Sequence, residues 1–217
     1  MPPKLTLDAL KTEAGKFAGE ESARWEPSLF GITDGKAVGT YFEHKFREHL
    51  RQKYEYREGS SASGIDFPEL GVDVKVTSIR QPQSSCPFRS ARQKVYGLGY
   101  SLLVFVYEKL DDPSTSTSKL TILHTIFVHR DRTGDFQTTT GLRRILDNQG
   151  NKDDLLAFIE ERRLPLDEVG ASALADEILA KPPKVGYLTV SNALQWRLQY
   201  RRVIELAGEA PGVERLR

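Results

Sequence analysis

The sequence predicts a protein of the α/β or α+β class, with a β-sheet core flanked by helices and a helical C-terminal part. Two observations predict this class: patterns typical of helices and strands alternate up to about residue 140, whereas helical patterns dominate from residue 141. The chain has 217 residues, which suits one core with a helical appendage and is too short for two large domains. We therefore expect a helical extension at residues 1–30, a core at 31–140 and a helical subdomain at 141–217, packed as one compact unit.

The first quarter of the chain predicts two helices. Residues from Leu5 to about Ser28 mix Ala, Glu and Lys with spaced apolar side chains, which indicates a short amphipathic helix and a connector. Between Lys36 and Arg51, apolar side chains recur every four residues and would line one face of a second helix. These side chains are Val38, Phe42, Phe46 and Leu50.

Two short strands joined by a tight turn are predicted after a Gly- and Ser-rich loop. The first covers Ile65 to Phe67, a turn follows at residues 68–71, and the second strand runs from Val72 to Thr77. Valines alternate with polar residues in the second strand, so Asp73 and Lys75 must point to the same side. The valines would anchor the other side of that strand in the core.

The rest of the chain predicts one helix, two strands and a series of helices. A helix is expected over Ser90 to Leu98, closed by Gly97 and Gly99. Tyr100 to Tyr107 is almost continuously apolar, which is typical of a strand buried on both faces, and Leu120 to Val128 predicts a strand antiparallel to it. Helices are expected over Leu142 to Asp147, Lys152 to Arg162, Ser172 to Leu179 and Val190 to Leu206.

Composition excludes some classes of protein and location. No apolar run is long enough to span a bilayer, so no membrane partner is expected. The single Cys86 cannot form an internal disulfide, which suits a reducing cytosol, and the N-terminus lacks the pattern of a secretory signal. We therefore expect a cytoplasmic protein.

Charge is distributed unevenly, although the net charge is only +1. Two stretches contain no Asp or Glu, from Val74 to Tyr107 and from Ile178 to Ile204, and each holds five Lys or Arg residues. Two basic surfaces are therefore expected, of the kind that contacts nucleic acid.

One small group of residues predicts chemistry. Asp66 ends the first short strand, and Asp73 and Lys75 share one face of the second, so a hairpin would bring all three together. Carboxylates that hold one or two Mg²⁺ ions, with a Lys nearby, can neutralise a phosphodiester and prepare an attacking water. This pattern predicts a metal-dependent nuclease.

The same residues resemble the PD-(D/E)xK nuclease superfamily, to which most restriction endonucleases belong. Asp66 corresponds to the first acid and Asp73-Val74-Lys75 to the D-x-K, although Ile65 stands where the name-giving Pro would be. The resemblance implies a restriction-endonuclease-like mixed sheet for the nuclease core, and a Glu on the preceding helix, for which Glu43 is the best match. It further implies that Asp66, Asp73 and Glu43 bind Mg²⁺ or Mn²⁺ and that Lys75 orients the attacking water.

By this resemblance, the expected protein is a Type II restriction endonuclease of a bacterium or archaeon. It would cut double-stranded DNA at a short specific sequence and would need no organic cofactor. A homodimer is expected because two active sites related by two-fold symmetry match a palindromic site. Two alternatives remain open: a structure-specific repair or junction nuclease of the same superfamily, and a catalytically inert DNA-binding module.

Candidate DNA contacts fall in three segments that carry hydroxyl, amide and basic side chains, which donate to phosphates and read base edges. The final segment could instead make a dimer or domain contact. The loop after Lys75 offers Thr77, Ser78, Arg80, Gln81, Gln83, Ser84 and Ser85. The helix that follows offers Arg89, Arg92, Gln93 and Lys94, and the final predicted helix offers Asn192, Gln195, Arg197 and Arg201.

Overall fold

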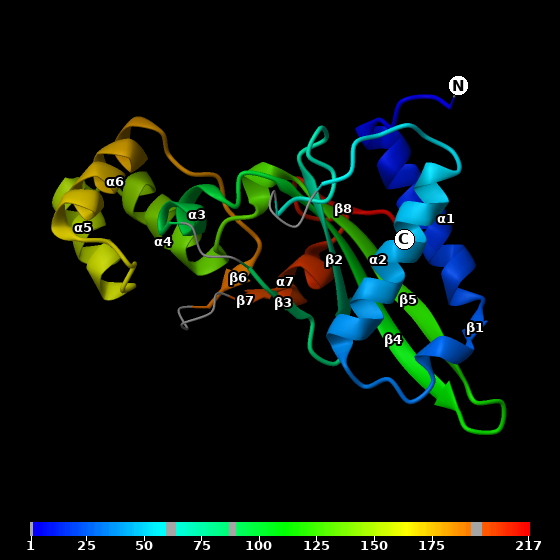
Figure 1. Cartoon of the computed structure of the whole chain (residues 1–217). Coiled ribbons are helices and arrows are strands. Elements are labelled where there is room, and N and C mark those ends of the chain that lie inside the picture. Colours follow the sequence, from blue (N-terminus) through cyan, green and yellow to red (C-terminus); the bar gives the residue numbers. More distant parts are fainter. Residues whose placement is uncertain (1, 60–63, 87–89, 192–196) are drawn as a thin grey trace. The chain divides into compact units, whose positions relative to one another are not determined.

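The computed structural model describes residues 2–59, 64–86, 90–191 and 197–217, which form two compact units. The first unit comprises Met1–Ser84, Ser101–Val128 and Leu206–Arg217. The second comprises Ser85–Tyr100 and His129–Glu205. The chain therefore crosses between the units four times. The colours in Figure 1 follow the chain from the N-terminus to the C-terminus.

The first unit is built on a mixed sheet with the strand order β1-β5-β4-β2. Strand β2 (Val72–Ser78) pairs in parallel with β4 (Ser101–Asp112), and β4 pairs antiparallel with β5 (Thr117–Val128). Strands β1 (Trp25–Glu26) and β8 (Val213–Arg215) each pair antiparallel with β5. The antiparallel pairing of the two long strands and the mixed character of the sheet are as predicted.

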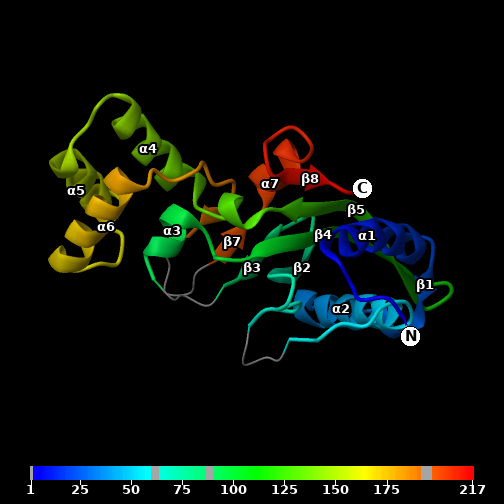
Figure 2. The same cartoon turned by 90° about the horizontal axis from the view of Figure 1, so that it is seen from above.

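Two helices of the first unit pack against β5 and β2 and share one apolar core with the sheet. Helix α1 (Leu7–Ser22) contacts β5, and helix α2 (Gly35–Arg51) contacts β2 (Figure 2). The predicted apolar face of α2 is confirmed, because Val38, Phe42, Phe46 and Leu50 are all buried. The rings of Phe42 and Phe105 of β4 lie 4.8 Å apart, which fixes the helix on the sheet.

Helix α2 begins where a side chain caps its first turn. Asp34 is the N-cap, and its carboxylate accepts a hydrogen bond from the N–H of Lys36 at 3.0 Å. The pairing satisfies one of the first free N–H groups of the helix.

Strand β4 is buried from Ser101 to Tyr107, so its prediction as a strand buried on both faces is confirmed.

The predicted first strand of the hairpin is wrong. Only Phe67 pairs with the following strand, through hydrogen bonds in both directions with Val72 of 2.9 and 3.2 Å. The turn at residues 68–71 is confirmed, with Gly71 at a positive φ of 61°. A longer hairpin would need the N–H of Val74, and the side chain of Asp66 occupies that donor instead.

The second unit is mainly helical. It contains α3 (Arg92–Tyr96), α4 (Phe136–Asp147), α5 (Lys152–Glu161) and α6 (Glu168–Ala180), and these elements share a core that includes Leu142, Leu155 and Ile178. Short elements complete the described chain: η1 (Pro27–Leu29), β3 (Gln83–Ser85), η2 (Arg130–Arg132), β6 (Thr189–Val190), β7 (Arg197–Gln199) and α7 (Arg201–Leu206). No helix of the described residues is long and apolar enough to cross a membrane.

The predicted long helix from Val190 to Leu206 is wrong. Val190 pairs antiparallel with Leu198 in a short hairpin of β6 and β7, and a helix begins only at Arg201. Leu198 and Tyr200 are buried while Arg197 and Gln199 are exposed, which is the period of two that a strand produces. The residues at 192–196 lie outside the described part of the chain.

Candidate active site

The first unit brings together the four residues that the sequence nominates for catalysis. Glu43 lies on α2, Asp66 precedes the turn into β2, and Asp73 and Lys75 lie on β2 itself. Because α2 packs on β2, the helix and the strand can present these side chains to one another. An ion pair joins Lys75 to Asp73, and the charges of Asp66, Asp73 and Lys75 all act on the pKa of Glu43.

Asp66 is held by two hydrogen bonds from different elements. Its Oδ2 accepts from the backbone N–H of Val74 at 2.8 Å, and its Oδ1 accepts from Nη2 of Arg47 on α2. The side chain is therefore fixed between the helix and the strand, adjacent to both Asp73 and Lys75. A carboxylate with two partners is well oriented for a further ligand.

Asp73 and Lys75 form an ion pair on one side of β2, as the alternation predicts. Nζ of Lys75 lies 2.7 Å from Oδ2 of Asp73. Burial raises the pKa of Asp73 to about 6 against the opposing pull of Lys75, and the nearby Asp66 carboxyl raises it further. Burial alone would lower the pKa of Lys75, but the carboxylates of Asp73, Asp66 and Glu43 outweigh it and raise that pKa. Lys75 is therefore charged at neutral pH.

Glu43 completes the electrostatic cluster. Burial raises the pKa of Glu43 to about 7, with a further contribution from the charge of Asp66, while Lys75 and Arg47 act in the opposite direction. Three acids beside two bases leave one excess negative charge when all are ionised. That excess is the condition that favours a bound cation.

Asp66 and Asp73 are the residues of the cluster that could hold a divalent ion. Among residues 2–59, 64–86, 90–191 and 197–217, no three His, Cys, Asp or Glu side chains are placed to hold one ion together. Mg²⁺ is commonly bound by one or two carboxylates, with water and substrate phosphate as the other ligands. Asp66 and Asp73 satisfy that requirement, and the participation of Glu43 stays a prediction.

Arg47 is the residue of this cluster that was missing from the sequence-based prediction. It lies four residues after Glu43, on the same face of α2, and it pairs with Asp66. The spacing from Glu43 is the signal that could have found it. Its guanidinium offsets part of the negative charge of Asp66.

The loop after Lys75 divides into internal and exposed residues. Thr77 is buried, and its hydroxyl accepts a hydrogen bond from the N–H of Gln83 at 3.0 Å, so it closes the loop instead of facing DNA. Ser78 accepts a hydrogen bond from the N–H of Arg80 at 3.3 Å. The exposed side chains are Arg80, Gln81 and Ser85, while Gln83 and Ser84 are half-buried.

The predicted contacts in the second unit also differ in exposure. Lys94 is buried, which corrects its assignment to a DNA-facing surface, and burial lowers its pKa against the effect of Asp135. Arg92 is exposed but is paired with Glu177, with 2.9 Å between Nε and Oε2. Three other predicted contacts have different environments: Gln93 is half-buried, Arg197 is exposed on β7, and Arg201 pairs with Glu205.

Three of the predicted DNA contacts have no structural description. Arg89, Asn192 and Gln195 lie outside the described residues.

Comparison with known proteins identifies the family of the chain. The profile of the family described as Type II restriction enzyme NspV matches residues 4–215. A curated relative from Nostoc sp. (strain ATCC 29411 / PCC 7524), named Type II restriction enzyme NspV, is 64% identical over 209 residues, covering 96% of this chain and 95% of the relative. No solved structure matches the chain. The chain therefore belongs to the NspV family of Type II restriction enzymes, which are site-specific deoxyribonucleases.

Proposed function

We propose that the chain is a Mg²⁺-dependent endonuclease that hydrolyses phosphodiester bonds of double-stranded DNA at a short specific sequence. The observation that carries this proposal is the cluster of Glu43, Asp66, Asp73 and Lys75 in one unit of a restriction-enzyme family member. Mn²⁺ would serve in place of Mg²⁺. The protein would act in the cytoplasm of its host.

Each residue of the cluster has a distinct part in the proposed reaction. Asp66 and Asp73 would hold the metal, which supplies neutralisation of the scissile phosphate when bound. Lys75 is charged and is fixed by Asp73, so its ammonium group can orient a water molecule toward the phosphorus. Glu43 lies close enough to Asp66 and Lys75 for their charges to shift its pKa, and it would complete the site. Together these groups neutralise developing charge and position the nucleophile.

We also propose that the active form is a homodimer. A palindromic duplex presents the same groups twice around a two-fold axis, and cutting both strands requires one active site for each. Sedimentation velocity of the wild type, alone and with duplex DNA, would reveal a particle of twice the mass of the chain. A single chain for each duplex that still cuts both strands would contradict the dimer.

The test of function is digestion of mixed plasmid and phage DNA, with Mg²⁺ or with a chelator. Wild type should give discrete fragments only with metal, whereas Lys75→Ala and Asp73→Ala should give none. The matched control is Lys109→Ala, because Lys109 pairs with Asp111 two residues away on β4 in the same kind of ion pair. Intact DNA with wild type across reasonable salt and pH would contradict the proposal.

Other results of the same test would identify the alternatives. Fragments from branched substrates alone would identify a structure-specific nuclease. Metal-independent binding without any cleavage would identify an inert DNA-binding module. If Lys75→Ala and Asp73→Ala cut as well as Lys109→Ala, the site has been assigned to the wrong residues.

A further inference from the structure

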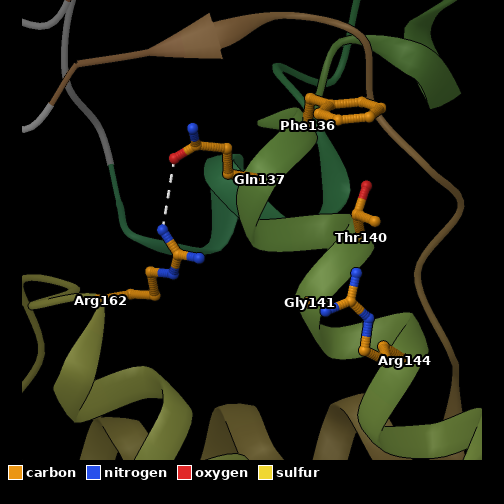
Figure 3. A pocket seen from close by; sticks show the side chains of 6 residues that line it. All are labelled: Phe136, Gln137, Thr140, Gly141, Arg144 and Arg162. Atoms are coloured by element: carbon orange, nitrogen blue, oxygen red, sulfur yellow. Dashed lines mark hydrogen bonds between the residues drawn. The ribbon is translucent and has the colours of Figure 1, made fainter.

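The second unit contains a recess of about 260 Å³ between α4 and the end of α5 (Figure 3). It is remote in sequence from the catalytic cluster, and the proposed reaction uses none of its residues. Six residues line it: Phe136, Gln137, Thr140, Gly141, Arg144 and Arg162. Two of them are arginines and none is acidic, so the recess has the character of an anion site.

Arg162 is held in place at the rim of the recess. Its Nη1 donates a hydrogen bond to Oε1 of Gln137 at 3.3 Å, the interaction drawn as a dashed line in Figure 3. Its guanidinium also lies over the ring of Phe158, 5.2 Å from the centroid. A guanidinium fixed by a neighbour and a ring loses little freedom when it binds an oxyanion.

Gly141 contributes to the same arrangement. A Cβ at this position would lie 2.3 Å from Cζ of Phe158, so the absence of a side chain lets the ring lie against α4. Phe158 is then placed beneath Arg162. The glycine therefore supports the position of the arginine.

Arg144 differs from its neighbour Arg143 in a way that points to a ligand. Arg143 pairs with Asp147 on the same helix, with 3.3 Å between Nη2 and Oδ1. Arg144 is exposed, and its side chain makes no hydrogen bond or ion pair with any residue that the structure describes. Its guanidinium is directed toward the recess in Figure 3. It is therefore free to bind an external anion.

Thr140 supplies an independent observation. Its hydroxyl oxygen is buried and has no hydrogen-bond partner among the described residues. A buried hydroxyl without a partner is unfavourable, so an oxyanion that accepted its proton would remove that penalty. Two guanidinium groups, an amide and a hydroxyl around one space are the donors typical of phosphate sites.

We infer that this recess binds a phosphate group of the DNA backbone, an inference that rests on the proposed function for the identity of the partner. Free phosphate has the same chemistry, but a restriction enzyme must hold a long polyanion in register while it searches for its site. Contacts to phosphate position the protein and carry no sequence information. Loss of this contact should therefore weaken binding equally for specific and unrelated duplexes.

The experiment measures binding of a fluorescent duplex by anisotropy, with the full chain in chelator, between 50 and 200 mM salt. Arg144→Gln and Arg162→Gln should each weaken binding by about tenfold at the lower salt. Each should also reduce the slope of log K against log salt by about 1, for specific and random duplexes alike. The control is Arg143→Gln, which removes a neighbouring arginine from outside the recess and should change the slope much less.

Three further measurements make the outcome decisive. If Arg162→Gln unfolds, as circular dichroism would show, Arg144→Gln carries the test because its side chain has no internal partner. The inference is overturned if the slope of log K against log salt is the same for Arg144→Gln as for Arg143→Gln. This holds even if calorimetry shows that inorganic phosphate binds the wild-type recess. Cleavage by wild type is measured separately, so failure of the nuclease proposal is distinguishable from failure of the recess.

Discussion

Oδ2 of Asp66 accepts a hydrogen bond of 2.8 Å from the backbone N–H of Val74, the residue between the acid and the lysine of the proposed D-x-K. The bond replaces the next backbone pair of a hairpin, so the chain before β2 does not continue as a strand. One side chain thus prevents a longer hairpin and also belongs to the proposed catalytic cluster. The consequences can be tested with variants that separate its charge from its hydrogen bonding.

Asp66→Asn should separate these two properties. The amide oxygen can still accept from the N–H of Val74, whereas the ion pair with Arg47 is lost, so the melting temperature should fall by only a few degrees. Loss of the charge should reduce cleavage by roughly 100-fold or more, because the proposed metal loses one ligand. Thermal unfolding measures the effect on stability, and plasmid digestion measures the effect on cleavage. Undiminished cleavage would show that Asp66 is not part of the active site.

Arg47→Gln should strengthen the binding of divalent ions. Arg47 and a cation compete for the same carboxylate, so removal of the guanidinium should raise the affinity for Ca²⁺ or Mg²⁺ by about tenfold. Calorimetric titration without DNA measures this affinity directly. Arg51→Gln is the matched control, since Arg51 lies one turn further along α2 and pairs with Glu58. Equal affinities for the two variants would show that Arg47 does not compete.

Glu43→Gln should make the metal-free protein more stable at pH 8 while reducing cleavage. The raised pKa of Glu43, caused first by burial and then by Asp66, means that its ionised form is unfavourable in the folded state. A neutral side chain of the same shape removes that cost, on the order of 1–2 kcal/mol after allowance for partial solvent exposure. Urea unfolding in chelator measures the gain, and a lower free energy of unfolding would contradict the prediction.

A different acid, Glu13 on α1, should determine part of the stability at low pH. Burial alone would raise its pKa, but hydrogen bonds from Lys53, His49 and Lys16 outweigh burial and lower the pKa from 4.5 to about 2. The distances to Lys53 Nζ and His49 Nε2 are 2.6 and 2.7 Å. Because the folded pKa is depressed, the stabilisation is complete above about pH 4.5 and is lost as the pH falls toward 2.

The measurement is the free energy of unfolding between pH 3 and 7 for wild type and Glu13→Gln. The variant should be less stable at pH 7, by an amount on the order of 3 kcal/mol or less, and should show a flatter decline below pH 4.5. Glu205→Gln serves as the control, because Glu205 is in an exposed helical pair with Arg201. Parallel curves for wild type and Glu13→Gln would contradict the assignment.

Sequence alone determined the parts of this protein that depend on local periodicity. The four-residue spacing on α2 placed its buried face, and the alternation on β2 placed Asp73 and Lys75 on one side. The continuous apolar run identified β4 as a strand buried on both faces. These three patterns arise because side chains on one face of a helix recur about every 3.6 residues and those on one face of a strand every two.

Tertiary structure decided which residues meet across the chain. The pairing of Arg47 with Asp66 joins a helix to a turn, and no local pattern encodes that contact. Burial of Lys94 and the short hairpin at Val190 also depend on packing against distant residues, which overrides local preference. The sequence therefore determined the strand that carries Asp73 and Lys75, while packing determined the partners of Asp66 and which of the expected DNA contacts remain exposed.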